Sequence, residues 1–238
     1  DAVAAQGETL ALVPTMGALH DGHLSLVEYA RQQADRVMMS IFVNPTQFGP
    51  GEDFLTYPRE PHSDQKKAFE AGCHVIFMPD VETMYPQGSA TTVVPGPLAH
   101  TLCGASRPGH FEGVCTVVLK LLNLTGCQHA IFGRKDFQQL AVIRSMVRDL
   151  NVPTTIHGCP IVRESDGLAM SSRNARLTPG DRNQARALWR GLSVAKQHWL
   201  AGQRNPRQLE ATVSAHLNAA QGAEIEYVEA VDPDSLRS

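Results

Sequence analysis

The stretch ALVPTMGALHDGHLSLVEYA, residues 11–30, joins a short apolar run to an amphipathic segment. The run from Ala11 to Pro14 predicts a buried parallel strand, because strands covered on both faces are apolar throughout. The residues from His20 to Gln33 predict a helix, whose apolar side carries Leu24, Leu26, Val27 and Ala30. Gly17 lies between them, where it allows a tight turn. The stretch therefore predicts a strand, a turn and a helix of an α/β fold.

The same alternation continues along the chain. Further strands are predicted at 36–43, 74–78, 130–132 and 154–159, and further helices at 63–71, 114–124 and 136–150. Strands that alternate with helices at this spacing predict a doubly wound, Rossmann-like parallel sheet. Ligands of such sheets bind beyond the carboxyl ends of the strands. The polar clusters that follow three of the strands are therefore the candidate site; they lie at 14–23, 44–47 and 133–139.

The character of the sequence changes near Ile161. Two amphipathic helices, at 179–201 and 206–220, are followed by one strand at 224–231. We therefore expect two domains: a Rossmann-like domain over 1–161, and a smaller α+β domain over 162–238. A lone strand has no ladder partner, so the second domain is expected to be truncated.

Composition excludes several classes of protein. Apolar residues make up 42% of the 238 residues and charged residues 19%, which is typical of a packed globular chain. A net charge of −3 gives no reason to expect nucleic acid or a membrane surface as a partner. The five cysteines are odd in number and form no C-x-x-C pair. This argues against a disulfide framework and a zinc knuckle, and favours reduced thiols in a cytoplasmic enzyme.

The first cluster places two histidines at the start of a helix. His20 and His23 are separated by one helical turn, so their rings share a face. A helix N-terminus already favours phosphate, and two imidazoles add donors that stabilise developing negative charge. The same residues also suit a capped helix with two solvated histidines, or a zinc pair that lacks a third ligand nearby.

The second cluster again follows a strand and opens a helix. Lys135 supplies a point charge for a phosphate, Asp136 can accept hydrogen bonds from ribose hydroxyls, and Gln139 lies one turn further along the same face. A surface Lys–Asp pair at a helix start is the alternative. The third cluster, Met170-Ser171-Ser172-Arg173-Asn174, sets two hydroxyls beside a guanidinium, as in a phosphate clamp. It also has an ordinary loop and N-cap composition.

Together these clusters resemble the HIGH/KMSKS-type nucleotidyltransferase superfamily, with His20–His23 in place of the first motif and Met170–Asn174 in place of the second. The resemblance to the pantothenate synthetase family is closer. It is carried, in order, by PTMGALHDGHLSLV, SIFVNPTQFG, RPGHFEGV, GRKDFQQL and GLAMSSRN. These motifs extend from Leu12 to Leu177, about two-thirds of the chain, and their conjunction makes the resemblance specific.

The resemblance implies an ATP-dependent ligase of pantothenate biosynthesis that is adenylate-forming, joins pantoate to β-alanine, and releases AMP and pyrophosphate. His20, His23 and Lys135 would be catalytic at the α-phosphate. ATP would further contact Met16, Gly133, Asp136, Met170, Ser171, Ser172 and Arg173. Pantoate would be held by Asn44, Gln47 and Gln139, with Met16 also lining its pocket. Mg²⁺ would accompany ATP, the second domain would act as a lid, and the enzyme would be a homodimer.

The chain departs from this family at a few points. Arg134 stands where the family usually has Glu, and its side chain is expected to point outward. The family often has more than one acidic residue near 63–65, whereas this chain has Asp64 alone, so no magnesium ligand is assigned. Family members begin before Asp1 and continue past Ser238, so both ends look trimmed.

Two rival functions follow from the same residues. One is an adenylyl- or cytidylyltransferase acting on a phosphorylated small molecule. Gln47 and Gln139 oppose it, because a phosphate acceptor site would more naturally hold Arg or Lys. The other is a non-catalytic nucleotide-binding module, which the intact His20, His23, Lys135 and Arg173 oppose.

Overall fold

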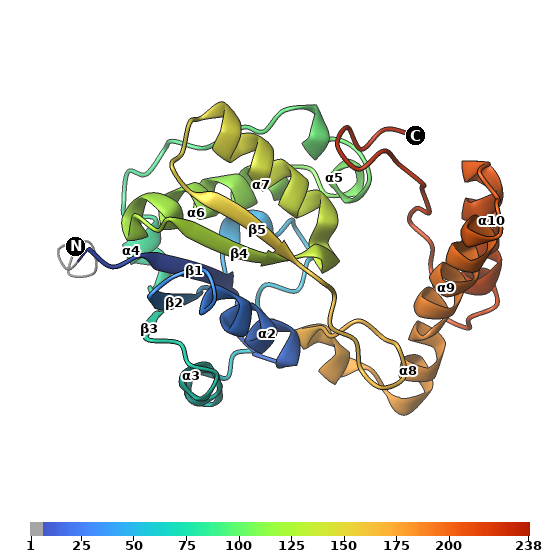
Figure 1. The fold of residues 1–238 in the computed structure, drawn as a ribbon, viewed down its shortest axis with the longest axis horizontal. Helices are drawn as coiled ribbons and strands as arrows, with labels where there is room; N and C mark the ends of the chain where they lie inside the picture. Colours follow the sequence, from blue (N-terminus) through green and yellow to red (C-terminus); the bar gives the residue numbers. More distant parts are fainter. Residues whose placement is uncertain (1–6) are drawn as a thin grey trace. The chain divides into compact units, whose positions relative to one another are not determined.

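The computed structural model describes residues 7–238, and the chain divides into two compact units, Asp1–Ile161 and Val162–Ser238. The first unit is built on a five-stranded sheet in which every pairing is parallel (Figure 1). The strand order is β3-β2-β1-β4-β5, which confirms the predicted doubly wound, Rossmann-like sheet. The strands are β1 (Leu10–Thr15), β2 (Arg36–Ile41), β3 (Val75–Phe77), β4 (His129–Gly133) and β5 (Thr155–Cys159).

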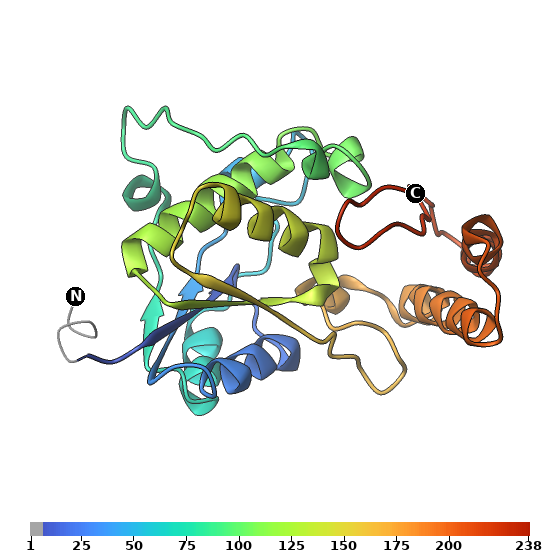
Figure 2. The same cartoon turned by 45° about the horizontal axis from the view of Figure 1, so that its top comes forward.

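Helices cover both faces of this sheet (Figure 2). On one face, α2 (Asp21–Ala30) and α3 (Pro61–Glu70) pack on a core that includes Val13. On the other, α6 (His110–Thr125) and α7 (Phe137–Asp149) pack on a core that includes Leu12. Successive residues of β1 thus enter opposite cores, which explains why this strand is apolar without alternation. Short helices complete the unit: η1 (Pro45–Gln47), α4 (Val81–Met84), η2 (Pro97–Ala99), α5 (Cys103–Ser106) and η3 (Arg134–Asp136).

The topology sets where a ligand can bind. β1 lies beside β4, but the helix that follows β1 covers one face of the sheet and the helix that follows β4 covers the other. This is a topological switch point, the place where ligands of doubly wound sheets bind. The His20–His23 and Gly133–Gln139 clusters occupy the loops after these two strands.

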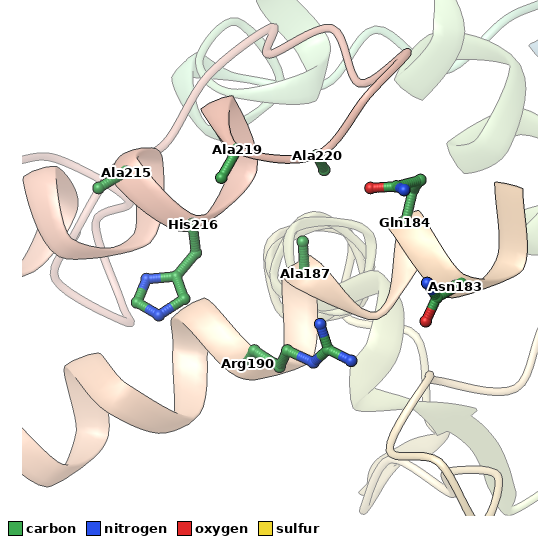
Figure 3. Close-up of a pocket in the computed structure, with 8 residues that line it drawn as sticks. All are labelled: Asn183, Gln184, Ala187, Arg190, Ala215, His216, Ala219 and Ala220. Carbon is green, nitrogen blue, oxygen red and sulfur yellow. The ribbon is translucent and has the colours of Figure 1, made fainter. Parts of the chain in front are cut away.

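The second unit is helical in its regular structure. It contains η4 (Ser172–Arg176), α8 (Pro179–Ala185), α9 (Ala187–Leu200) and α10 (Pro206–Asn218). α9 and α10 pack around Ala187, Val213, Leu217 and Ala220. A hollow of about 360 Å³ lies within this unit (Figure 3). None of the predicted site residues lines it; the lining residues are Asn183, Gln184, Ala187, Arg190, Ala215, His216, Ala219 and Ala220.

Two predictions for this unit are wrong. The helix expected over 179–201 is two helices, although Arg186 between them keeps helical dihedrals (φ −62°, ψ −16°), so no glycine or proline marks the break. The strand expected over 224–231 does not form, and that segment has no regular secondary structure. A strand needs a ladder partner. Within residues 162–238, all of which are described, the only β pairing is an isolated bridge between Arg163 and Ala169.

No helix within residues 7–238 combines the length and the apolar character needed to cross a bilayer. All five cysteines are free thiols.

Candidate functional site

The turn between β1 and α2 is held from both sides. The Thr15 hydroxyl donates to the carbonyl of Ser40 at 2.8 Å and accepts the backbone N–H of Gly17 at 3.3 Å. Gly17 and Ala18 then both have positive φ angles, of 87° and 49°. Across the turn, the carboxylate of Asp64 on α3 accepts the backbone N–H groups of Ala18 and Leu19. The backbone therefore enters α2 along a fixed path.

His20 and His23 begin α2 as a reciprocal cap. The Nδ1 atom of His20 accepts the N–H of Gly22 at 3.2 Å, and the Nδ1 atom of His23 accepts the N–H of His20 at 3.4 Å. Because both Nδ1 atoms are acceptors, each neutral ring carries its proton on Nε2. The helix is thus capped, as one alternative held, and each ring keeps an Nε2–H donor.

The pKa of His23 is lowered to about 3, first by burial and then by the neighbouring His20 and Lys135. His23 is therefore neutral at pH 7 and acts as a hydrogen-bond donor rather than as a cation. Lys135, which follows β4, is thus one of the charges that His23 at the start of α2 experiences.

The loop after β4 presents the second cluster. The Lys135 ammonium lies 3.3 Å from Asp136 Oδ1, and both side chains are exposed. Arg134 points elsewhere: its Nε donates to the carbonyl of Gly158 on β5 at 3.0 Å. The departure from the family pattern at Arg134 thus falls on a side chain that binds the neighbouring strand.

Asn44 organises the loop after β2. Its side chain is 1% exposed, and its Oδ1 accepts the hydroxyls of Thr46 and Tyr85, each at 2.9 Å. Its Nδ2 donates to Gln47 Oε1 at 3.1 Å, and Gln47 Nε2 in turn donates to the sulfur of Met16 at 3.4 Å. Met16, Asn44 and Gln47 are therefore brought together, with Asn44 orienting the amide of Gln47.

Residues of the RPGHFEGV segment, for which the sequence predicts no role, also fix this loop. His110 Nδ1 donates to the carbonyl of Gln47 at 2.8 Å, while His110 Nε2 accepts from Arg107, which is paired with Glu52. Burial is the first cause that lowers the pKa of His110. Glycine at position 113 lets α6 approach this loop closely, because a Cβ there would lie 2.3 Å from the carbonyl oxygen of Thr46.

Gln138 and Gln139 are neighbours with different surroundings. Gln138 is buried, and its Nε2 donates to the carbonyls of Leu98 and Thr101 at 2.9 and 2.6 Å. The half-buried Gln139 makes no side-chain hydrogen bond within residues 7–238. Its contact with pantoate stays a prediction.

The third cluster belongs to the second unit. Ser171 caps η4, its hydroxyl accepting the N–H of Arg173 at 3.3 Å, so the N-cap composition is used as such. Asn174 ties this helix to the preceding turn through Glu164 Oε1 at 2.8 Å and the Ala169 carbonyl at 3.0 Å. Hydrogen bonds within the second unit therefore hold the segment that carries Met170, Ser171, Ser172 and Arg173.

A protein-held metal does not fit these residues. Among residues 7–238, no group of three His, Cys, Asp or Glu side chains could hold a metal ion. The zinc alternative for His20 and His23 therefore gains no third ligand. Asp64, the acidic residue considered for magnesium, already uses both carboxylate oxygens on backbone N–H groups.

Comparison with known proteins gives a consistent result. The family model for pantoate-beta-alanine ligase matches residues 1–238. The chain is 54% identical to a pantothenate synthetase of Oleidesulfovibrio alaskensis, over 97% of this chain and 83% of that protein. It resembles the crystal structure of pantothenate synthetase from Thermus thermophilus, with a TM-score of 0.94, 47% identity, and coverage of 96% and 83% of the two chains.

A second solved structure carries ligands. It is the pantoate-beta-alanine ligase of Francisella tularensis complexed with beta-gamma ATP and beta-alanine. The chain resembles it with a TM-score of 0.77 and 38% identity, over 89% of this chain and 79% of that one.

Proposed function

Because the chain belongs to the pantoate-beta-alanine ligase family, it is an enzyme that joins pantoate to β-alanine, and we propose that it does so by way of a pantoyl adenylate. In the first step a carboxylate oxygen of pantoate attacks the α-phosphorus of ATP, and pyrophosphate leaves. In the second the amine of β-alanine attacks the acyl carbon, AMP leaves, and the nitrogen loses a proton to give the amide.

One observation supports this proposal: the two loops with phosphate-binding residue types follow the adjacent parallel strands β1 and β4, on either side of the switch point. Lys135 lies close enough to His23 to contribute to its low pKa. Neutral His20 and His23 would donate through Nε2–H to the phosphate oxygens, while Lys135 would supply positive charge as pyrophosphate departs. Gly133 and Asp136 would hold the ribose, and Ser171, Ser172 and Arg173 would bind further phosphates.

The acceptor side of the site suits a hydroxyl-bearing acid that carries no phosphate. Gln47 is oriented by Asn44, and Gln139 makes no side-chain hydrogen bond within residues 7–238. We assign these two amides to the hydroxyls of pantoate, with Met16 beside them. Amides bind hydroxyls without the full positive charge that a phosphorylated acceptor would need.

The chemistry asks for positioning and charge stabilisation rather than a nucleophilic side chain. A carboxylate and an amine are themselves the nucleophiles, so the site needs to align them and to exclude water from the adenylate. Mg²⁺ would arrive on the ATP phosphates, since magnesium commonly keeps several waters and binds largely through its nucleotide.

The setting of the enzyme completes the proposal. Five free thiols suit the reducing cytoplasm. We further propose that it is a homodimer, which light scattering on the eluting peak of a sizing column would test.

The decisive experiment is exchange of labelled pyrophosphate into ATP. We expect exchange to require pantoate and to proceed without β-alanine, because the adenylate forms before the amine reacts. Exchange that ignores pantoate, or that needs a phosphorylated acceptor, would refute the adenylate mechanism. Arg173→Ala should weaken the use of ATP and raise hydrolysis of the adenylate, measured as AMP released without pantothenate.

A further inference from the structure

Asp64 is a buried carboxylate to which the mechanism above gives no chemical step. It lies on α3, is 1% exposed, and contacts the turn that leads into His20. Its Oδ1 accepts the backbone N–H of Leu19 at 2.7 Å, and its Oδ2 accepts that of Ala18 at 2.9 Å. Two short hydrogen bonds from successive amides to one charged group are strong and directional.

The turn that Asp64 grips is one that the backbone does not favour by itself. Ala18 has a φ angle of 49°, a left-handed conformation that is uncommon for residues other than glycine. Such a conformation persists where the surroundings hold it in place. Gly17 leaves room for the grip, because a Cβ there would lie 2.9 Å from Asp64 Oδ2. A second group on α3 assists, since Lys67 Nζ donates to the Leu19 carbonyl at 2.9 Å.

We propose that Asp64 is a positioning residue, which holds the Ala18–Leu19 backbone so that His20 and His23 face the reacting phosphate, and that it is not a ligand of magnesium. The inference rests on the function proposed above. His20 follows Leu19 directly and His23 is hydrogen-bonded to the His20 backbone, so a shift of this turn moves both rings. A displacement of about 1 Å can cost on the order of 10²-fold in rate.

The contacts of Asp64 favour this role over metal binding. Both of its oxygens are engaged by the chain, and no metal-binding group of three His, Cys, Asp or Glu side chains exists in the described part of the molecule. The nearby Lys67 ammonium adds a positive charge to the turn, which would oppose a divalent cation.

The test is Asp64→Asn, with Glu70→Gln as its matched control on the exposed side of the same helix. The new carboxamide could accept one N–H but would present its NH₂ to the other, so one backbone amide loses its partner. We expect pantoate-dependent pyrophosphate exchange to fall by about 10–100-fold, with the magnesium concentration for half-maximal rate unchanged. The amide NMR signals of Ala18 and Leu19 should shift upfield and exchange faster with solvent, whereas Glu70→Gln should change neither.

A defect in Asp64→Asn that is repaired by more magnesium would overturn the proposal and make Asp64 a metal ligand. Unchanged amide signals and unchanged exchange would overturn it as well. If Asp64→Asn does not fold, Lys67→Met loosens the same turn: we expect a several-fold loss of exchange, while magnesium binding by Asp64 would predict no loss. If the wild type shows no pantoate-dependent exchange, the proposed function fails, and the two amide signals still decide whether Asp64 anchors the turn.

Discussion

The imidazole rings of His20 and His23 lie with their centroids 4.1 Å apart, tilted by 32°. Two rings this close cannot both be charged at low cost, and burial is the larger effect, so His23 has a pKa of about 3. His23 is therefore a neutral Nε2–H donor at pH 7.

This protonation state makes folding sensitive to acid. Between pH 6.5 and 3 the unfolded chain protonates His23 while the folded protein does not, so the free energy of unfolding falls as the pH drops through that window. From about pH 7 to 5 the loss due to His23 is at most about 2 kcal/mol. His23→Gln should lose less stability between these two pH values in urea denaturation. Equal pH slopes in the variant and the wild type would contradict the prediction.

His20 has two roles that one substitution can separate. Asn is a favoured N-cap, so His20→Asn should keep α2 capped and change stability by under about 1 kcal/mol. It lacks the Nε2–H donor, so pantoate-dependent exchange should fall by about 10²–10³-fold. A rate close to that of the wild type would show that His20 only caps the helix.

Lys135 and Arg134 are adjacent cations with different surroundings. Lys135→Ala should lower exchange by about 10²–10³-fold with little effect on stability, because the side chain is exposed and pairs with exposed Asp136. Arg134→Ala is the matched control, since that side chain donates to Gly158 on β5. Comparable losses of turnover in the two variants would mean that charge in general, rather than Lys135, serves the reaction.

The two adjacent glutamines give a second matched pair. Gln139→Leu should raise the KM for pantoate by about 10-fold or more, as expected when a substrate hydroxyl loses its partner, and should leave the melting temperature unchanged. Gln138→Leu should instead lower the melting temperature and leave the KM for pantoate unchanged. It removes the donor of two backbone carbonyls, which costs about 1–3 kcal/mol of stability. Steady-state kinetics and thermal melts on both variants test this. A raised KM in Gln138→Leu together with a lowered melting temperature in Gln139→Leu would contradict the assignment.

Gly133 tests the adenosine site. Its dihedrals (φ −84°, ψ 140°) suit any residue, and a Cβ there would have no atom within 4 Å. Gly133→Ala should therefore keep or slightly raise stability, by about 0.4–1 kcal/mol. If ATP lies against this backbone, the added methyl group should raise the KM for ATP several-fold. An unchanged KM would remove Gly133 from the nucleotide site.

The sheet could be predicted because its signals are local. The β1 run is apolar without alternation, and this follows from Leu12 and Val13 entering separate cores. The α8–α9 break could not be predicted, since Arg186 keeps helical dihedrals and neither glycine nor proline marks the boundary. The segment 224–231 has strand composition, but strand formation depends on a partner that composition does not report.

The site shows the same division. Sequence placed His20, Lys135 and Gln139 at strand ends, and the parallel topology brings the first two loops together. The residues that hold the site in place could not be predicted from the sequence, because they act through the backbone. Asp64 holds amides of another segment, and Gly113 matters through a close approach to Thr46. Neither property follows from residue type.

The order of the strands has a practical consequence. Helix α2 and its histidines belong to the part of the chain that contains β1, β2 and β3. Lys135 and Gln139 belong to the later part, which contains α6, β4, α7 and β5. The stretch 87–92 between them is exposed. A single cut there would place complementary parts of one active centre on two fragments. Turnover that returns when the two fragments are mixed would then report that β1 and β4 have paired again. The enzyme could in this way serve as a split reporter of its own assembly.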